Sequence, residues 1–151
     1  MKSKANSPIF FAGSDDFRGW LEKHHQTITE QWVGFHRKSS GRVSITWPEA
    51  VDEALCFGWI DGLRKTIDTG SYKIRFTPRR PSSIWSAINI ARIRELIRQG
   101  RVRLAGRTAF QKRTPAKSHA YSYENRKAAK LSGAATKLFR AESAAWKFFQ
   151  R

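Results

Sequence analysis

The spacing of apolar residues predicts a first helix close to the start of the chain. Phe17, Trp20 and Leu21 follow the i, i+3, i+4 spacing of one helix face. Ser14 precedes them as a candidate N-cap, and the two aspartates after it suit the positive end of a helix. We therefore expect a helix from Ser14 to about His25.

Three other segments have the pattern of strands. Residues 8–11 form a short apolar run, and residues 27–37 carry aromatic side chains between polar ones. Residues 71–76 alternate strictly, with three apolar residues on one side and Lys73 and Arg75 on the other. This alternation is typical of a strand with one buried face.

A second helix is bounded by clear start and stop signals. Thr46 can act as its N-cap, Pro48 suits its first turn, and Glu49 stands at the capping-box position. Gly58 can adopt the left-handed conformation that closes the helix. A further strand is then expected to begin at Trp59, with a turn or bulge at the Asp-Gly pair that follows.

The remaining helices are predicted from the same kinds of signal. A long helix is expected to begin at Ser82 or Ser83, after a Pro-rich break, and to end at Gly100. The chain beyond Gly106 is rich in Lys, Arg and Ala. We expect short helices there around residues 124–131, 134–141 and 143–150.

Together these elements predict an α+β fold, in which a small, mainly antiparallel sheet is packed by two or three helices and followed by a basic helical C-terminal tail. The 151 residues suit an ordinary domain that buries its core without a disulfide or a metal. We expect a core domain over residues 1–115 and a basic Ala-, Lys- and Arg-rich segment over residues 116–151.

The charge distribution narrows the class of partner. The formal net charge is +17, and it is uneven: residues 1–62 hold 7 Lys or Arg against 8 Asp or Glu, whereas residues 63–151 hold 22 against 4. This asymmetry indicates a small anionic molecule or a polyanion such as nucleic acid, bound without sequence selectivity. The alternative is that the charge only keeps the protein soluble.

Composition and motifs argue against several other classes. Cys56 is the only cysteine, which rules out an intramolecular disulfide, and the adjacent His24 and His25 lack the i, i+4 spacing of metal ligands. No glycine-rich nucleotide motif is present, so we expect no metal and no cofactor. The apolar run at residues 9–12 is too short for a signal peptide, and no segment is long enough to span a membrane, so a cytoplasmic protein is expected.

Two long motifs follow each other along the chain. The first is WPEAVDEALCFGWIDG at residues 47–62, and the second is RFTPRRPSSIWS at residues 75–86. Together they resemble the YdeI/OmpD-associated family of bacterial proteins, also labelled bacteriocin-protection proteins, and the likeness covers nearly the whole chain. The resemblance implies the fold and a bacterial origin, while the family's name reflects an association rather than a mechanism. Family members continue past a W-x-F-F element (residues 146–149) with a further basic helical segment, so this chain is either a short member or part of a longer protein.

The first candidate binding site is the basic turn before the third predicted helix. Free N–H groups at a helix start near Ser82 or Ser83 can hold a phosphate or a carboxylate. Arg79 and Arg80 can add bidentate, charge-assisted hydrogen bonds, and Arg75 on the preceding strand is placed to face the same site. The alternative is that the serine only caps the helix and the arginines are solvated.

The second candidate site consists of Trp59, Asp61 and Trp85. A polar residue between tryptophans can line a pocket that stacks a planar ligand. The alternative is that both tryptophans pack in the core and that Asp61 forms an ion pair with Arg64 or Arg75.

Catalysis has two candidate residues. A Cys56 nucleophile would need a stabilised thiolate, but Cys56 stands near a helix C-terminus in an apolar stretch, where negative charge is disfavoured. Asp61 could act as an acid or a base on a small anionic metabolite. We expect a non-catalytic protein that binds an anionic ligand or a polyanion; the alternatives are an enzyme that uses Asp61 and a plain protein-interaction module.

Overall fold

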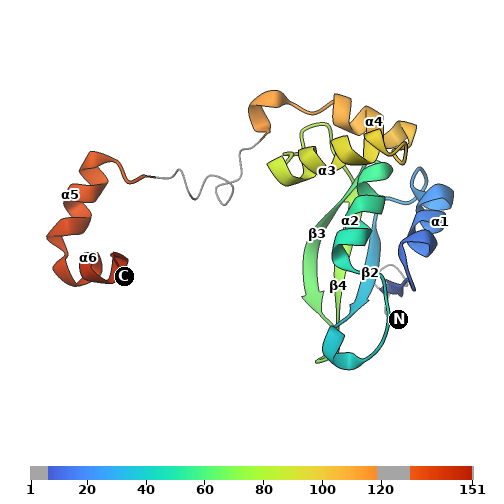
Figure 1. Ribbon diagram of the computed structural model, residues 1–151, viewed down its shortest axis with the longest axis horizontal. Helices are drawn as coiled ribbons and strands as arrows, with labels where there is room; N and C mark the ends of the chain where they lie inside the picture. Colours follow the sequence, from blue (N-terminus) through green and yellow to red (C-terminus); the bar gives the residue numbers. More distant parts are fainter. Residues whose placement is uncertain (1–6, 119–129, 151) are drawn as a thin grey trace. The chain divides into compact units, whose positions relative to one another are not determined.

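The computed structural model of the chain describes residues 7–118 and 130–150 (Figure 1). The chain divides into two compact units, Met1–Ala120 and Tyr121–Arg151. Within the described residues, the first unit contains a four-stranded sheet with helices packed on it, and the second contains two short helices. The predicted α+β class is therefore confirmed.

The strands of the sheet lie in the order β1-β2-β4-β3. They are β1 (Ile9–Phe10), β2 (Gln31–His36), β3 (Trp59–Thr66) and β4 (Ser71–Pro78). β1 runs parallel to β2, and the other neighbouring pairs are antiparallel, so the sheet is mainly antiparallel as predicted. The irregularity expected at Asp61 is a register shift between Asp61 and Arg64, which lets β3 continue beyond it.

The helices of the first unit are α1 (Ser14–His24), α2 (Trp47–Cys56), α3 (Ala87–Arg98) and α4 (Leu104–Gln111), with short 3-10 turns at Lys38–Ser40 and Pro115–Lys117. The second unit contains α5 (Gly133–Ala141) and α6 (Ser143–Phe149). The limits of α2 follow the predicted signals, because the Glu49 carboxylate accepts the Thr46 backbone N–H at 2.9 Å and Gly58 has a φ of 73°. The helix expected around residues 124–131 lies largely outside the described residues.

The start of α3 corrects the sequence prediction. Its N-cap is Ser86, whose hydroxyl accepts the Asn89 backbone N–H at 3.1 Å, and not Ser82 or Ser83. The Ser83 hydroxyl instead accepts the Arg80 backbone N–H at 3.0 Å, within a turn that comes before the helix. Ser82, Ser83 and Ser86 all precede the helix, and the turn at Arg80 uses Ser83. Helix α4 has no counterpart among the predicted elements.

Helices α1 and α2 pack against one face of the sheet, while α3 and α4 pack against α2 (Figure 1). Alternate positions of the strands supply the core, so Val33 and Phe35 of β2 and Ile74 and Phe76 of β4 are buried on the helical side. The Phe17 ring of α1 contacts the Phe76 ring at a centroid distance of 5.5 Å. The opposite face of the sheet therefore presents the positions between them, such as Trp32 of β2 and Lys73 of β4.

A buried carboxylate joins the helices around the end of α2. Glu53 is 1% exposed, and its Oε2 accepts a hydrogen bond from Nη1 of Arg18 at 2.9 Å. Arg101 forms a second ion pair with the same carboxylate, and Arg18 Nη2 donates to the Arg101 carbonyl at 2.9 Å. This network connects α1 and α2 to the segment before α4, and so it helps to fix where α4 begins.

Candidate functional site

A groove of about 830 Å³ opens beside the C-terminal turn of α2 in the first unit. Its walls come from the end of α1, the turn between α2 and β3, the segment after β4, and helix α4. Its size is that of a small-molecule binding site. The groove therefore gathers residues that are up to 90 positions apart in the sequence, from Glu22 to Lys112.

Four basic residues line this groove. Arg79 and Arg80 come from the segment after β4, and Arg103 and Lys112 flank the two ends of α4. Glu22 is the one acidic residue among the lining residues. Arg103 Nη2 donates to Glu22 Oε1 at 2.7 Å, and this hydrogen bond lowers the pKa of Glu22. The other three cations leave the groove with a net positive charge.

Apolar side chains make up much of the remaining wall. Phe57, Pro78, Pro81 and Ala109 contribute to it, and Leu104 is 79% exposed at the start of α4. A site with apolar walls and a few charged groups suits a ligand that combines an apolar body with an anionic group.

Backbone hydrogen bonds hold both basic walls against the same turn. The Arg79 N–H donates to the Gly58 carbonyl at 2.9 Å, and the Arg103 N–H donates to the Cys56 carbonyl at 2.9 Å. The turn at residues 56–58 thus fixes the starting points of two segments that are far apart in sequence. The positions of the two arginines follow from the backbone.

Two glycines allow α4 to approach this turn closely. Gly58 has a φ of 73°, and a Cβ there would lie 2.8 Å from the carbonyl oxygen of Ala105. A Cβ at Gly106 would lie 2.5 Å from the carbonyl oxygen of Cys56. Any larger residue at either position would push α4 away from α2, so the width of the groove depends on both glycines.

Arg79 is held in a defined position, whereas Arg80 is exposed. The guanidinium carbon of Arg79 lies 3.7 Å from the centroid of the Trp85 ring, and Nη1 donates to the Ile84 carbonyl at 3.2 Å. Arg80 extends from the Ser83 turn with an exposed side chain. The pair therefore combines one preorganised cation with one that can adjust to a ligand.

His25 forms part of the α1 wall in a fixed tautomer. Its Nδ1 lies 2.7 Å from the Leu21 carbonyl, and because a carbonyl only accepts, Nδ1 carries the hydrogen. The Trp59 indole N–H donates to the His25 carbonyl at 3.2 Å. Nε2 is consequently the ring nitrogen left to contact a ligand.

Of the site residues predicted from the sequence, Arg79, Arg80 and Trp59 line the groove. Trp59 is 1% exposed and Trp85 is 2% exposed, so both rings lie in the core. Trp85 contributes to the groove indirectly, because the Arg79 guanidinium lies over its ring. Neither ring offers a face on which a planar ligand could stack.

The other residues considered from the sequence lie away from the groove lining. Arg75 is 3.5 Å from Glu30 in an ion pair, and Asp61 accepts the indole N–H of Trp47 at 2.9 Å. Ser82 and Ser83 precede α3 by several residues, so the expected helix-start anion site at these serines is not formed. The interpretation of residues 75–83 as one site was therefore too broad.

Sequence reasoning missed Arg103 and Lys112. They belong to a helix that was not expected, and their charges looked like part of a diffuse basic stretch. The available signal was Gly106, because a glycine within a helix that has a basic residue at each end indicates close packing there.

Cys56 has the environment of an inert thiol. It is fully buried, and burial raises the pKa of its thiol, with the charge of Glu53 raising it further. Among the described residues, no three His, Cys, Asp or Glu side chains gather as a metal site would require. The helices of the described part of the chain are all too short or too polar to cross a membrane.

One comparison with known proteins gives a match. A family model described as a domain of unknown function (DUF8412) matches residues 9–109. No curated protein and no solved structure matches the chain. The matched residues contain the whole sheet, α1 to α3, and most of α4.

Proposed function

The chain belongs to the DUF8412 family, and we propose that it is a non-catalytic protein that binds a small anionic ligand in the groove beside α2. The observation that carries this proposal is that Arg79, Arg80 and Lys112 line one groove. Glu22 is the one acidic residue of the groove lining, and it is already paired with Arg103. Such an arrangement attracts an anion and gives it several charge-assisted hydrogen bonds.

The apolar walls define the rest of the ligand. Inorganic phosphate would contact the cations alone, whereas an aryl or alkyl phosphate or carboxylate would also cover the exposed side chains of Leu104 and Pro81. Burial of apolar surface contributes about 25 cal/mol per Å², so the organic anion is expected to bind more tightly. The proposed ligand class is therefore an organic phosphate or carboxylate with an apolar or planar body.

The positions of the two catalytic candidates support a binding protein that is not an enzyme. Asp61 does not line the groove and is hydrogen-bonded to Trp47. Cys56 is fully buried beneath the turn, with a raised thiol pKa. An enzyme built on either residue would need its substrate in another place.

We further propose that the protein is cytoplasmic, bacterial and related to the YdeI/OmpD-associated proteins. The two motifs that carry this resemblance supply neighbouring parts of the groove lining. Residues 47–62 contain the Gly58 turn, and residues 75–86 contain Arg79, Arg80 and the supporting Trp85. A shared groove would account for both motifs.

A thermal-shift panel tests the proposal. Phenyl phosphate and benzoate carry an anion on a planar apolar body, inorganic phosphate lacks the body, and benzyl alcohol lacks the charge. We expect the two aryl anions to raise the melting temperature most, since a ligand at about 100 times its Kd stabilises by about 2.7 kcal/mol. Equal shifts with benzyl alcohol, or shifts that persist in an Arg79→Ala/Arg80→Ala double variant, would contradict it.

A further inference from the structure

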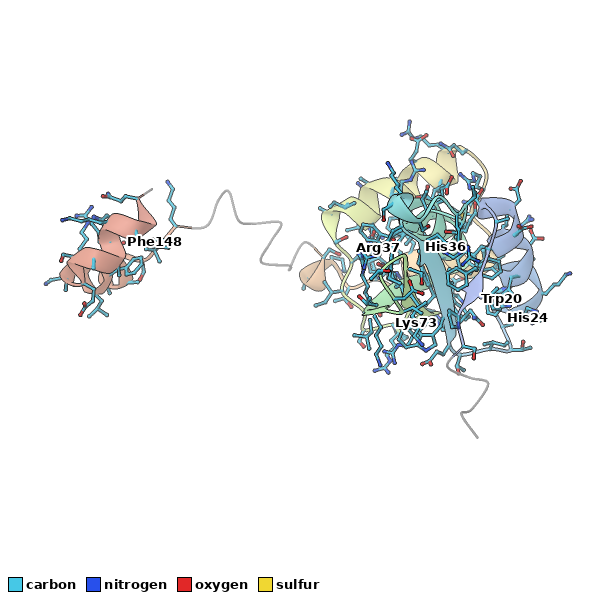
Figure 2. All side chains as sticks on the ribbon, turned by 90° about the horizontal axis from the view of Figure 1, so that it is seen from below. Trp20, His24, His36, Arg37, Lys73 and Phe148 are labelled. Carbon is cyan, nitrogen blue, oxygen red and sulfur yellow. The ribbon has the colours of Figure 1, made fainter. Side chains whose placement is uncertain are left out.

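The face of the sheet opposite the helices carries aromatic and basic side chains. We define the outer sheet face by Phe10 of β1, Trp32 and His36 of β2, Lys65 of β3, and Lys73 and Arg75 of β4. Strand alternation places these residues on the side away from Val33, Phe35, Ile74 and Phe76. Figure 2 labels His36 and Lys73 on the neighbouring strands β2 and β4, and Trp20 and His24 on α1.

The strand register aligns one row across all four strands. Phe10 is paired with Gly34, Gly34 with Lys73, and Lys73 with Lys65. Neighbouring strands lie about 4.8 Å apart, so the aromatic end and the basic end of this row are about 10 to 15 Å apart. An extended ligand that carries both rings and negative charges can contact the whole row.

The aromatic end of the row is exposed and is held by ring stacking. The Phe10 ring stacks on the His36 ring, with 4.5 Å between centroids and 16° between planes. Phe10 is nevertheless 40% exposed. A Cβ at Gly34 would lie 2.6 Å from the Phe10 ring, so the glycine provides the space that this ring occupies.

The basic end of the row lies over a third aromatic ring. Lys73 Nζ is 4.6 Å and Lys65 Nζ is 5.5 Å from the centroid of the Trp32 ring. Trp32 is 4% exposed, and its indole N–H donates to Glu30 Oε1 at 3.1 Å. Glu30 also forms an ion pair with Arg75.

We propose that the outer sheet face binds single-stranded nucleic acid. Unpaired bases would stack on the Phe10–His36 pair, and the phosphates would contact Lys65 and Lys73. Single strands satisfy both requirements, because they offer exposed base faces together with a regular series of negative charges. A duplex keeps its base faces stacked internally, so it offers phosphates and base edges but no face for an aromatic ring to stack on. This site lies on the opposite side of the sheet from the helices and does not depend on the groove.

The test is fluorescence anisotropy of a labelled oligo(dT) of about 12 nucleotides with the full chain, at several salt concentrations. Phe10→Leu keeps an apolar side chain over Gly34 but removes the ring, and we expect it to weaken binding roughly 5- to 150-fold. Phe10→Tyr keeps the ring and is expected to bind like the unaltered chain. Circular dichroism and the melting temperature establish that each variant is folded.

Two further variants keep the proposal open to refutation if Phe10→Leu fails to fold. Lys65 is exposed, and Lys65→Ala is expected to make the slope of log Kd against log salt about one unit shallower. Arg107→Ala, at an exposed α4 residue outside the groove lining, is the matched charge control and is expected to leave the affinity for oligo(dT) unchanged. Unchanged binding by Phe10→Leu, an unchanged salt slope for Lys65→Ala, or an equal loss with Arg107→Ala would overturn the assignment.

Discussion

The guanidinium of Arg79 lies over the ring of Trp85, with its central carbon 3.7 Å from the ring centroid. Trp85 is almost fully buried, so a core side chain fixes the position of a groove cation. Arg80, the next residue, has an exposed side chain and no such support. Two adjacent arginines in one groove thus play different physical roles.

This difference predicts different effects on stability. Arg79→Ala removes the contact with Trp85 and the hydrogen bond to Ile84, and we expect it to lower the free energy of unfolding by about 1–2 kcal/mol. Arg80→Ala removes an exposed side chain and is expected to change it by less than about 0.5 kcal/mol. Urea unfolding measures both values, and equal effects of the two substitutions would count against the structural role of Trp85.

The buried Glu53 carboxylate predicts a large effect from a small substitution. Glu53→Gln keeps the shape of the side chain but leaves Arg18 and Arg101 without their shared counter-charge. We expect a loss of about 3 kcal/mol in the free energy of unfolding. Glu95→Gln, which breaks the surface pair with Arg98, serves as the control and is expected to cost less than about 0.5 kcal/mol. Similar losses in both variants would show that Glu53 is no more important than a surface acid.

The close approach of α4 to the Gly58 turn predicts a loss of stability when a Cβ is added at Gly58. Gly41→Ala places alanine at a φ of 68° in open space, so it should cost about 1 kcal/mol through the backbone alone. Gly58→Ala adds a contact of 2.8 Å with the Ala105 carbonyl oxygen and is expected to cost clearly more. Chemical unfolding of the two variants separates backbone strain from displacement of α4. If both cost the same, α4 does not depend on Gly58 for its place.

The buried Cys56 thiol predicts that stability depends on pH and that the reactivity of the thiol depends on unfolding. Burial holds its pKa above the ordinary value, so the folded state favours the protonated thiol. Its contribution to stability is therefore unchanged below the ordinary thiol pKa and becomes unfavourable as the pH rises above it, because the unfolded chain then loses the proton more readily. Ellman's reagent should react slowly with the native protein at alkaline pH and rapidly in denaturant. Rapid reaction of the native protein would contradict the buried position.

Local signals in the sequence predicted the sheet and α2 well. The capping box at Thr46 and Glu49 and the glycine at position 58 act within a few residues of their own helix, so their effects can be read directly. The cap of α3 was misjudged because Ser83 and Ser86 are both suitable caps, and only the turn at Arg80 determines which one is used.

Only two of the four basic residues of the groove lining were candidates from the sequence, for a different reason. Arg79 and Arg80 belong to a recognisable motif, but Arg103 and Lys112 reach the groove through the contact of Gly106 with the end of α2. A contact between segments about 50 residues apart leaves no periodic pattern in the sequence. The same limit applies to Arg101, which pairs with the buried Glu53 48 residues away.

The most direct test of the groove is calorimetric titration of phenyl phosphate into four versions of the full chain. These are the unaltered protein, Arg80→Ala, Lys112→Ala, and Arg107→Ala, an exposed α4 residue outside the groove lining. We predict that Arg80→Ala and Lys112→Ala weaken binding roughly tenfold to a hundredfold, because each removes a charged hydrogen-bond donor, and that Arg107→Ala binds like the unaltered protein. Equal affinities in all four proteins, or an equal loss in Arg107→Ala, would contradict the proposal that this groove is the anion-binding site.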